Sequence, residues 1–278
     1  MAPTAGDRKA AEELKAEGNT LFSKGKYAAA IERYTEAITL CPEWAVLYVN
    51  RGMAARKRAD WDRVEADAGA ALALGPGVRE AMKGHYLMGL ATGARGDHER
   101  STQHLRKALD AAREANDAIK DEIWRELATA NYQHWQAESG ARRASHAALR
   151  RQLAELLRQN GADLPPQPPA QHGVSAQPAL PPEWSALFSQ AAWQDVPSEA
   201  PSQFTCPLTM EIFRDPVTTP SGRSYERTAL LEHLKKVGRF DPITRQQLTE
   251  EALVPNVSLR AAIEVYLEEH PWAWGEVK

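Results

Sequence analysis

Apolar and polar positions follow three different patterns along this chain. Up to about residue 160 the sequence is rich in Ala, Leu, Glu, Lys and Arg, with apolar residues at helical spacing. That period predicts successive amphipathic helices. Between residues 161 and 200 the helical period ends, and the sequence is instead rich in Pro, Ala, Gln and Ser. A mixed pattern of turns and apolar stretches returns from Phe204 and predicts a second compact unit.

Residues 161–200 are expected to form a semi-rigid, largely extended linker. The stretch 164–169 holds four prolines, and proline cannot continue a helix because it lacks the backbone N–H and clashes with the preceding turn. The same segment also contains a group of apolar residues too large for a passive spacer. They predict a short helix that docks on a neighbouring element, and they are Trp184, Leu187, Phe188 and Trp193.

The helical part repeats internally with a period of 34 residues. The pairs that share this spacing are Gly18 and Gly52, Ala37 and Ala71, and Pro42 and Pro76. Such a period is typical of tetratricopeptide repeats, in which each repeat is an antiparallel pair of helices that small residues allow to approach closely. A weaker third repeat runs from Met82 to about Arg113, with Gly89 in the small position. The alternative is an unrelated helical bundle with coincidental spacing.

These patterns predict a mainly α protein with a small α+β domain. The extension after the repeats should consist of two helices, at about 117–138 and 141–159, which lengthen or cap the array. The four expected parts are three helix pairs at 8–115, this helical extension at 116–160, the Pro/Ala-rich linker with its apolar helix at 161–200, and the C-terminal unit at 201–275.

Composition narrows the classes of function. The formal net charge of -3 gives no general attraction to nucleic acid or to an anionic membrane. Residues 1–11 lack the apolar core of a secretory signal, and no run of about 18 apolar residues exists. We therefore expect a cytoplasmic protein, with the nucleus as the alternative location.

Cysteine usage excludes two further classes. Cys41 and Cys206 are the only cysteines and lie in different segments, so no disulfide framework is expected. Two cysteines also exclude the multi-cysteine zinc cages of RING, LIM and ribbon modules. We expect neither a metal nor a cofactor.

The stacked helix pairs should form a concave groove lined by the first helix of each repeat. Four polar side chains are expected to face it: Lys15, Asn19, Asn50 and Lys83. Two ammonium groups would supply charge-assisted donors and two amides could bridge to peptide backbone, which suits an extended peptide rich in carboxylates. For any one lysine the alternative is a solvated surface charge.

These four positions resemble the two-carboxylate clamp of chaperone-binding tetratricopeptide domains. In that family the groove holds the Glu-Glu-Val-Asp tail of the heat-shock 70 and 90 chaperones. The fifth position of the clamp, often Arg, is Leu87 here and follows Tyr86. An apolar pair at this place resembles the CHIP family of chaperone-associated ubiquitin ligases. That resemblance implies further peptide contacts from Ile119 and Glu122 on the next helix.

The C-terminal unit resembles the U-box of the same family over essentially its whole length. A U-box copies the RING shape without zinc, which agrees with the scarcity of cysteine. The segments that carry the resemblance are FTCPLTME at 204–211, TPSG at 219–222, a helix at 226–237, GRFDPITR at 238–245, and LVPNV at 253–257 before a last helix that ends near His270.

The resemblance implies a ligase that does no covalent chemistry itself but holds a ubiquitin-charged conjugating enzyme in a reactive geometry. Leu208, Met210 and Pro242 would form the apolar patch that receives this enzyme. Arg245 would be a linchpin whose donors bridge the enzyme and ubiquitin, and His233 would lie near the same groove. A rival interpretation makes Cys206 a covalent ubiquitin carrier. No activating His and acid pattern surrounds it, so we interpret it as buried packing.

Three functions remain open at this point. The leading one is a ligase that marks misfolded clients held by heat-shock 70 and 90 chaperones. The others are a non-catalytic co-chaperone adaptor, and a ligase whose clamp binds different acidic C-termini. The family's dimer surface corresponds to Val254, Asn256 and Val257, so we also expect a homodimer. Part of the helical hairpin that helps that family to dimerise is replaced here by prolines.

Overall fold

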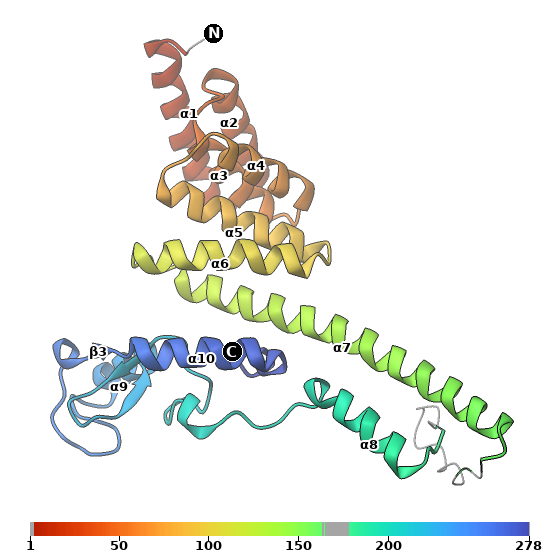
Figure 1. Cartoon of the computed structure of the whole chain (residues 1–278). Helices are drawn as coiled ribbons and strands as arrows, with labels where there is room; N and C mark the ends of the chain where they lie inside the picture. Colours follow the sequence, from red (N-terminus) through yellow and green to blue (C-terminus); the bar gives the residue numbers. More distant parts are fainter. Residues whose placement is uncertain (1–2, 163, 165–177, 278) are drawn as a thin grey trace. The chain divides into compact units, whose positions relative to one another are not determined.

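The computed structural model describes residues 3–162, 164 and 178–277 and divides the chain into two compact units, Met1–Asn131 and Tyr132–Lys278 (Figure 1). Most of the predicted Pro-rich stretch therefore lies outside the described residues. Within these residues the fold is mainly helical with one small sheet, as the sequence predicts.

Successive helix pairs build the first unit (Figure 1). Contacts are densest within each pair and between neighbouring pairs, which is the arrangement of a repeat array. The pairs are α1 (Ala5–Ser23) with α2 (Tyr27–Leu40), α3 (Ala45–Arg56) with α4 (Trp61–Ala73), and α5 (Val78–Ala94) with α6 (His98–Glu114).

The small positions of the 34-residue repeat lie where the two helices of a pair touch. A Cβ placed on Gly18 would come within 2.5 Å of a ring carbon of Tyr34 on α2. A Cβ on Gly89 would come within 2.6 Å of Leu105 Cγ on α6. Since neither contact is compatible with a side chain, the structure confirms why the repeat keeps glycine there.

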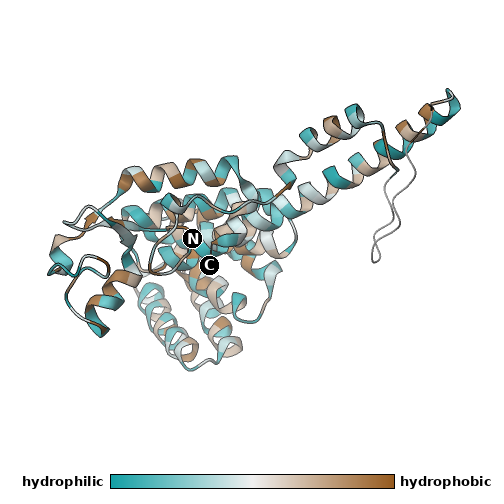
Figure 2. Cartoon of the chain, turned by 90° about the horizontal axis from the view of Figure 1, so that it is seen from below, coloured by the Kyte–Doolittle hydropathy of each residue, from teal (hydrophilic) through white to brown (hydrophobic). Residues whose placement is uncertain are grey.

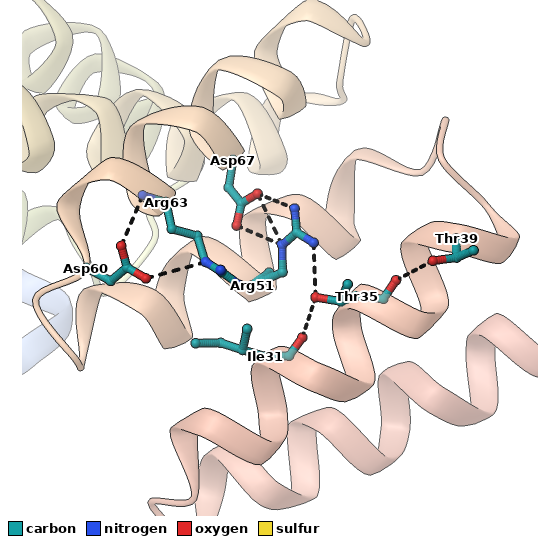
Figure 3. A network of polar contacts seen from close by, with 7 residues as sticks. All are labelled: Ile31, Thr35, Thr39, Arg51, Asp60, Arg63 and Asp67. Atoms are coloured by element: carbon teal, nitrogen blue, oxygen red, sulfur yellow. Dashed lines mark hydrogen bonds and ion pairs between the residues drawn. The ribbon is translucent and has the colours of Figure 1, made fainter.

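A buried ion pair inside the second repeat is linked to the first repeat by a hydrogen bond. Arg51 on α3 donates from Nε and Nη2 to Asp67 on α4, at 3.0 and 2.6 Å, and from Nη1 to Thr35 Oγ1 on α2 at 3.0 Å (Figure 3). Asp67 is 2% exposed, so the charge of its carboxylate is stabilised by this arginine and not by water. The contact therefore fixes the register of three helices.

The extension after the repeats is one helix, α7 (Lys120–Gln159), and the predicted break near residue 140 is wrong. Gly140 lies inside this helix, and nothing lies within 4 Å of the place where its Cβ would be. A single glycine costs a helix only about 1 kcal/mol relative to alanine. The strong helix formers on both sides outweigh that cost.

The short apolar helix predicted near Trp184 exists as α8 (Pro182–Ala191), followed by a turn of 3₁₀ helix, η1 (Trp193–Asp195). It docks on α7. The ring of Phe188 lies 6.1 Å from the ring of His146 and 5.2 Å from the guanidinium of Arg150. Arg142 on α7 also donates to Asp195 at 2.6 Å.

Hydrophobic and hydrophilic residues alternate along α7 and α8 (Figure 2). Leu149 and Leu156 on α7 are 50% and 56% exposed, and Leu187 on α8 is 54% exposed.

The rest of the second unit is built around a small antiparallel sheet of order β2-β1-β3. In the register, Val217 faces Tyr225 on one side and Pro255 on the other. The elements are η2 (Ser202–Phe204), β1 (Pro216–Thr218), β2 (Ser224–Glu226), α9 (Arg227–Lys236), η3 (Glu250–Ala252), β3 (Val254–Pro255), α10 (Val257–Glu269) and η4 (Pro271–Glu276). The predicted helices at 226–237 and before His270 match α9 and α10.

Candidate functional site

Two loops of the second unit bring exposed apolar side chains to the surface. The first loop is residues 206–211, and the second loop is residues 239–248. Each is closed by an isolated antiparallel bridge, between Thr205 and Ile212 in one case and between Phe240 and Gln247 in the other. Both loops are thus tied at their ends.

Cys206 organises the first loop from inside. Its side chain is fully buried, and its Sγ accepts hydrogen bonds from the backbone N–H of Leu208 at 3.4 Å and of Glu226 at 3.2 Å. The N–H of Met210 donates to the carbonyl oxygen of Cys206 at 2.8 Å. Since no solvent reaches the thiol, these contacts give Cys206 a structural role and support the packing interpretation.

Glu226 fixes the segment that follows the first loop. It is 3% exposed, and its carboxylate accepts from the backbone N–H of Arg214 at 2.8 Å and of Asp215 at 3.2 Å. Burial raises the pKa of Glu226, and the two backbone donors oppose that rise. These two hydrogen bonds hold the backbone that follows the first loop.

Asp241 does the same for the second loop. Its Oδ1 accepts from the Tyr225 hydroxyl at 2.8 Å and from the backbone N–H of Ile243 and Thr244, both at 2.9 Å. Its Oδ2 accepts from the hydroxyls of Ser221 at 2.8 Å and Thr219 at 3.1 Å. Five donors therefore converge on one carboxylate, which is 1% exposed.

The pKa of Asp241 reflects this network. Burial alone would raise it, but the N–H groups of Thr244 and Ile243 and the hydroxyls of Ser221 and Tyr225 together lower the pKa well below its usual range. Asp241 is consequently ionised at neutral pH, and its charge holds the second loop in shape.

Most residues predicted for the conjugating enzyme lie on these loops. Leu208 is 37% exposed and Met210 is 78% exposed, while Pro242 on the second loop is half-buried. Arg245 on the same loop is exposed. Ile243, which the sequence analysis did not single out, is 47% exposed and adds to the apolar group.

His233 lies on α9 under the second loop. Its Nε2 is 3.1 Å from the carbonyl oxygen of Phe240, and its ring meets the Phe240 ring edge to face at 5.1 Å. Both contacts support the loop from below. The structure therefore gives His233 a supporting part, and its direct contact with the enzyme stays a prediction.

The residues of the expected dimer surface divide into two kinds. Val254 and Val257 are 62% and 58% exposed. Asn256 is half-buried and already occupied, because its Oδ1 caps α10 at the Leu259 N–H and its Nδ2 donates to Ser224 Oγ. Only the two valines present apolar surface.

In the first unit the structure brings two of the four clamp residues together. Asn50 Nδ2 on α3 donates to Asn19 Oδ1 on α1 at 3.2 Å, and the Tyr34 hydroxyl donates to the same oxygen at 2.9 Å. Lys15 and Lys83 are half-buried on α1 and α5. The ammonium of Lys15 lies 4.2 Å from the centre of the Trp44 ring, a cation–π contact.

Glu122 at the start of α7 is held by two residues of the array. Its Oε1 accepts from Arg56 Nη2 on α3 at 2.6 Å and from the Tyr86 hydroxyl on α5 at 2.8 Å. Burial would raise the pKa of Glu122, but these two hydrogen bonds lower it overall. The carboxylate is therefore charged and fixed in position. Ile119, one turn earlier, is half-buried.

Tyr86 and Leu87 do not form the apolar groove surface that the sequence suggested. Both are fully buried. Leu87 packs in the core with Ala54 and Met88, and its Cδ1 lies 3.0 Å from where a Gly52 Cβ would be. A tail peptide could contact them only after the helices moved.

Sequence reasoning missed several supporting residues. No local sequence pattern pointed to Arg56, because its partner Glu122 lies 66 residues further along the chain. Asp241 did carry a sequence signal, because an Asp at the start of a stretch such as Asp-Pro-Ile-Thr is typical of a turn in which the side chain accepts hydrogen bonds from backbone N–H groups. Trp44, Tyr225 and Phe240 became visible only through their contacts.

Among residues 3–162, 164 and 178–277, no group of three or more His, Cys, Asp or Glu side chains could hold a metal ion. The helices in these ranges are too short or too polar to span a bilayer.

Comparison with known proteins agrees with both units. Residues 200–272 match the U-box domain family, and residues 18–55 match a tetratricopeptide repeat family. The repeat unit is also similar to the TPR2B domain of yeast Sti1 in a complex with pHsp70, at 26% identity over 45% of this chain and 98% of that one, with a TM-score of 0.42.

Fold and sites together define a protein that joins tetratricopeptide repeats to a U-box. The E3 ubiquitin-protein ligase CHIP of Arabidopsis thaliana is 40% identical over 268 residues, which cover 95% of each chain. The WD repeat, SAM and U-box domain-containing protein 1 of Homo sapiens is 40% identical over 73 residues, 26% of this chain and 15% of that protein. The chain belongs to the CHIP family of E3 ubiquitin-protein ligases.

Proposed function

We propose that this protein recruits a ubiquitin-charged conjugating enzyme to its two loops and promotes transfer without forming a covalent intermediate. The observation that carries the proposal is the pair of loops itself, on which Leu208, Met210 and Ile243 are exposed although polar networks hold the backbone rigid. A preformed apolar surface binds a partner without an ordering cost. Cys41 and Cys206, the only thiols, are both buried and are not nucleophiles in this scheme.

Arg245 would act as the linchpin. Arg245 is exposed on the second loop, two residues after Ile243, and its five N–H donors in a planar fork could bridge carbonyl oxygens of the enzyme and of ubiquitin. Holding the thioester and its carrier in one geometry lowers the barrier to attack by a lysine amine.

A reconstituted assay with activating enzyme, a panel of conjugating enzymes and ubiquitin tests the ligase function. We expect the wild type to build chains and Leu208→Ala to lose about tenfold or more, because a central apolar contact contributes about 1–2 kcal/mol to binding. Val265→Ala is the matched control, since Val265 is an exposed apolar residue on α10 and should keep wild-type activity.

Two results would count against the ligase function. If Leu208→Ala were as active as the control, the loops would not be the binding surface. A wild type that is inactive with every conjugating enzyme, while still binding a chaperone tail, would favour the adaptor function instead.

We propose further that the groove of the first unit binds the acidic C-terminal tails of heat-shock 70 and 90 chaperones, so that misfolded clients held by them are ubiquitinated in the cytoplasm. Asn19 and Asn50 already meet across α1 and α3. Together with Lys15 on α1 and Lys83 on α5, they would offer amide and ammonium donors to carboxylates.

Titration with a peptide ending in Glu-Glu-Val-Asp tests the clamp. Lys15→Ala should weaken binding by about tenfold to a hundredfold, because a hydrogen bond to a charged group contributes about 1.5–3 kcal/mol. Lys9→Ala, an exposed lysine on the same helix, is the control and should bind as the wild type does. Amidation of the peptide's C-terminus should have an effect as large as Lys15→Ala.

Equal affinity of the Lys9 and Lys15 variants would contradict the clamp. Tight binding of other acidic C-termini, with weak binding of both chaperone tails, would keep the groove but change its ligand.

A homodimer is the third proposal. Val254 and Val257 are exposed apolar residues at the end of the sheet, and the hairpin of α7 and α8 exposes further leucines. Mass measurement in solution should give a dimer at micromolar concentration, and replacing both valines with Asp should raise the dimer dissociation constant by at least tenfold because it buries charges without partners. A wild type that is monomeric at that concentration would overturn this proposal.

A further inference from the structure

The linchpin arginine lies on an aromatic ring. The Cζ of Arg245 is 4.8 Å from the centre of the Phe240 ring, which places the guanidinium over the ring face. The backbone below it is also fixed, because Arg245 N donates to the carbonyl oxygen of Asp241 at 3.0 Å and Arg245 has a φ of 62°. Because φ is positive at Arg245, its side chain leaves the backbone in a different direction from the side chains of the residues before it.

Phe240 itself is held from three sides. The edge-to-face contact with His233 at 88° fixes the plane of the ring. Gly238, with a φ of 157°, leaves room for the ring, since a Cβ there would come within 2.4 Å of a Phe240 ring carbon. The bridge to Gln247 fixes its backbone. Phe240 is half-buried and therefore offers one face outward as a rigid platform.

A cation–π contact suits an arginine that must still donate hydrogen bonds. A guanidinium that rests on a ring uses its flat face, while its N–H groups point outward in its own plane. The contact with Phe240 can thus restrict the side chain without occupying a single donor. A long side chain that is ordered beforehand loses less conformational entropy when it engages a partner.

We propose that Phe240 is a positioning residue for ubiquitin transfer: it holds Arg245 in the orientation from which the arginine contacts the charged conjugating enzyme. This inference rests on the proposed ligase function. Phe240 need not touch ubiquitin or the enzyme in this scheme. Its effect passes through Arg245, so it should change the rate of transfer and leave the affinity for the enzyme unchanged.

The test measures the discharge of ubiquitin from a pre-charged conjugating enzyme onto free lysine, as a function of the concentration of the full chain. That titration separates the maximal rate from the half-saturating concentration. Phe240→Leu should lower the maximal rate on the order of tenfold. A tenfold change in rate corresponds to the free energy of one cation–π contact that a bound partner shields from water. Phe240→Tyr, which keeps the ring face, should restore most of the rate.

Two further comparisons make the result specific to Arg245. In the Arg245→Ala background, Phe240→Leu should cause no additional loss, because the residue through which it acts is absent. Fluorinated phenylalanines at position 240 keep the ring's shape but weaken its negative face. The maximal rate should therefore fall in step from phenylalanine to difluoro- and pentafluorophenylalanine, even if Phe240→Leu does not fold.

The proposal is overturned if the fluorinated series leaves the maximal rate unchanged. It is equally overturned if the double variant loses the full product of the fold-losses in rate that the Phe240 and Arg245 substitutions cause singly. It is also overturned if Phe240→Leu folds and raises only the half-saturating concentration. A wild type without discharge activity would instead remove the ligase function on which this inference depends.

Discussion

Replacing Asp241 with alanine should unfold the second loop and lose about 3–5 kcal/mol of local stability, because it leaves the buried donors of this network without their charged acceptor. The backbone N–H groups of Ile243 and Thr244 cannot rotate to find other partners. Hydrogen exchange on the full chain measures the loss directly. Peptides covering the second loop should lose protection, while helices α1 to α6 should not change.

Asp241→Asn is the matched variant. An asparagine oxygen can still accept from Tyr225 and the two N–H groups, and its amide can donate to the hydroxyls of Ser221 and Thr219, which are able to turn. It should therefore lose only about half as much as Asp241→Ala. Equal protection in wild type and Asp241→Ala would show that the network does not hold the loop.

The same carboxylate makes the stability of the second loop depend on pH in the acid range. Its pKa is lowered in the folded protein, so its contribution is complete above the unfolded value of about 3.9 and is lost progressively as the pH falls toward the lowered pKa. Asp241→Asn should flatten that part of the stability profile, although the absolute stability is lower.

Arg245→Ala should lower the maximal rate of ubiquitin discharge by about a hundredfold or more, because removal of one oriented donor to a developing charge costs about 2.7–4 kcal/mol. The side chain is exposed, so folding and the affinity for the conjugating enzyme should change little. The measurement is single-turnover discharge at saturating concentrations of the variant.

Arg245→Lys is the comparison that separates charge from geometry. Lysine keeps the charge and the same left-handed backbone position but lacks the planar fork. It should recover only part of the rate. If Arg245→Ala discharged ubiquitin as fast as the wild type, the linchpin role would be excluded, and with it the reason for the contact with Phe240.

Much of the architecture could be predicted from local sequence. The 34-residue period and its glycines indicate helix pairs because a small residue is needed wherever two helices touch, as Gly18 and Tyr34 show. The prediction failed where local preference was ambiguous. Two helices were predicted at 117–138 and 141–159, whereas the structure has one. The glycine between the predicted helices, Gly140, costs a helix only about 1 kcal/mol, which is small beside the propensity of the residues around it.

The sites were predicted less completely. Sequence placed Leu208, Met210 and Arg245 on loops, which is where the structure has them. It placed Tyr86 and Leu87 on the groove, whereas both are buried. A helix period shows that two residues share a face, but it does not show how close the next helix will pack against that face.

By itself, then, the sequence determined the order of the elements, the repeat and the two loops, because those depend on residues near one another in the chain. Only the tertiary structure decided that Arg56 and Tyr86 hold Glu122, that one Asp241 carboxylate serves five donors, and that Arg245 rests on Phe240. The first two join segments far apart in sequence, and the third depends on backbone angles. Such contacts follow from the angles at which elements pack, which no local pattern encodes.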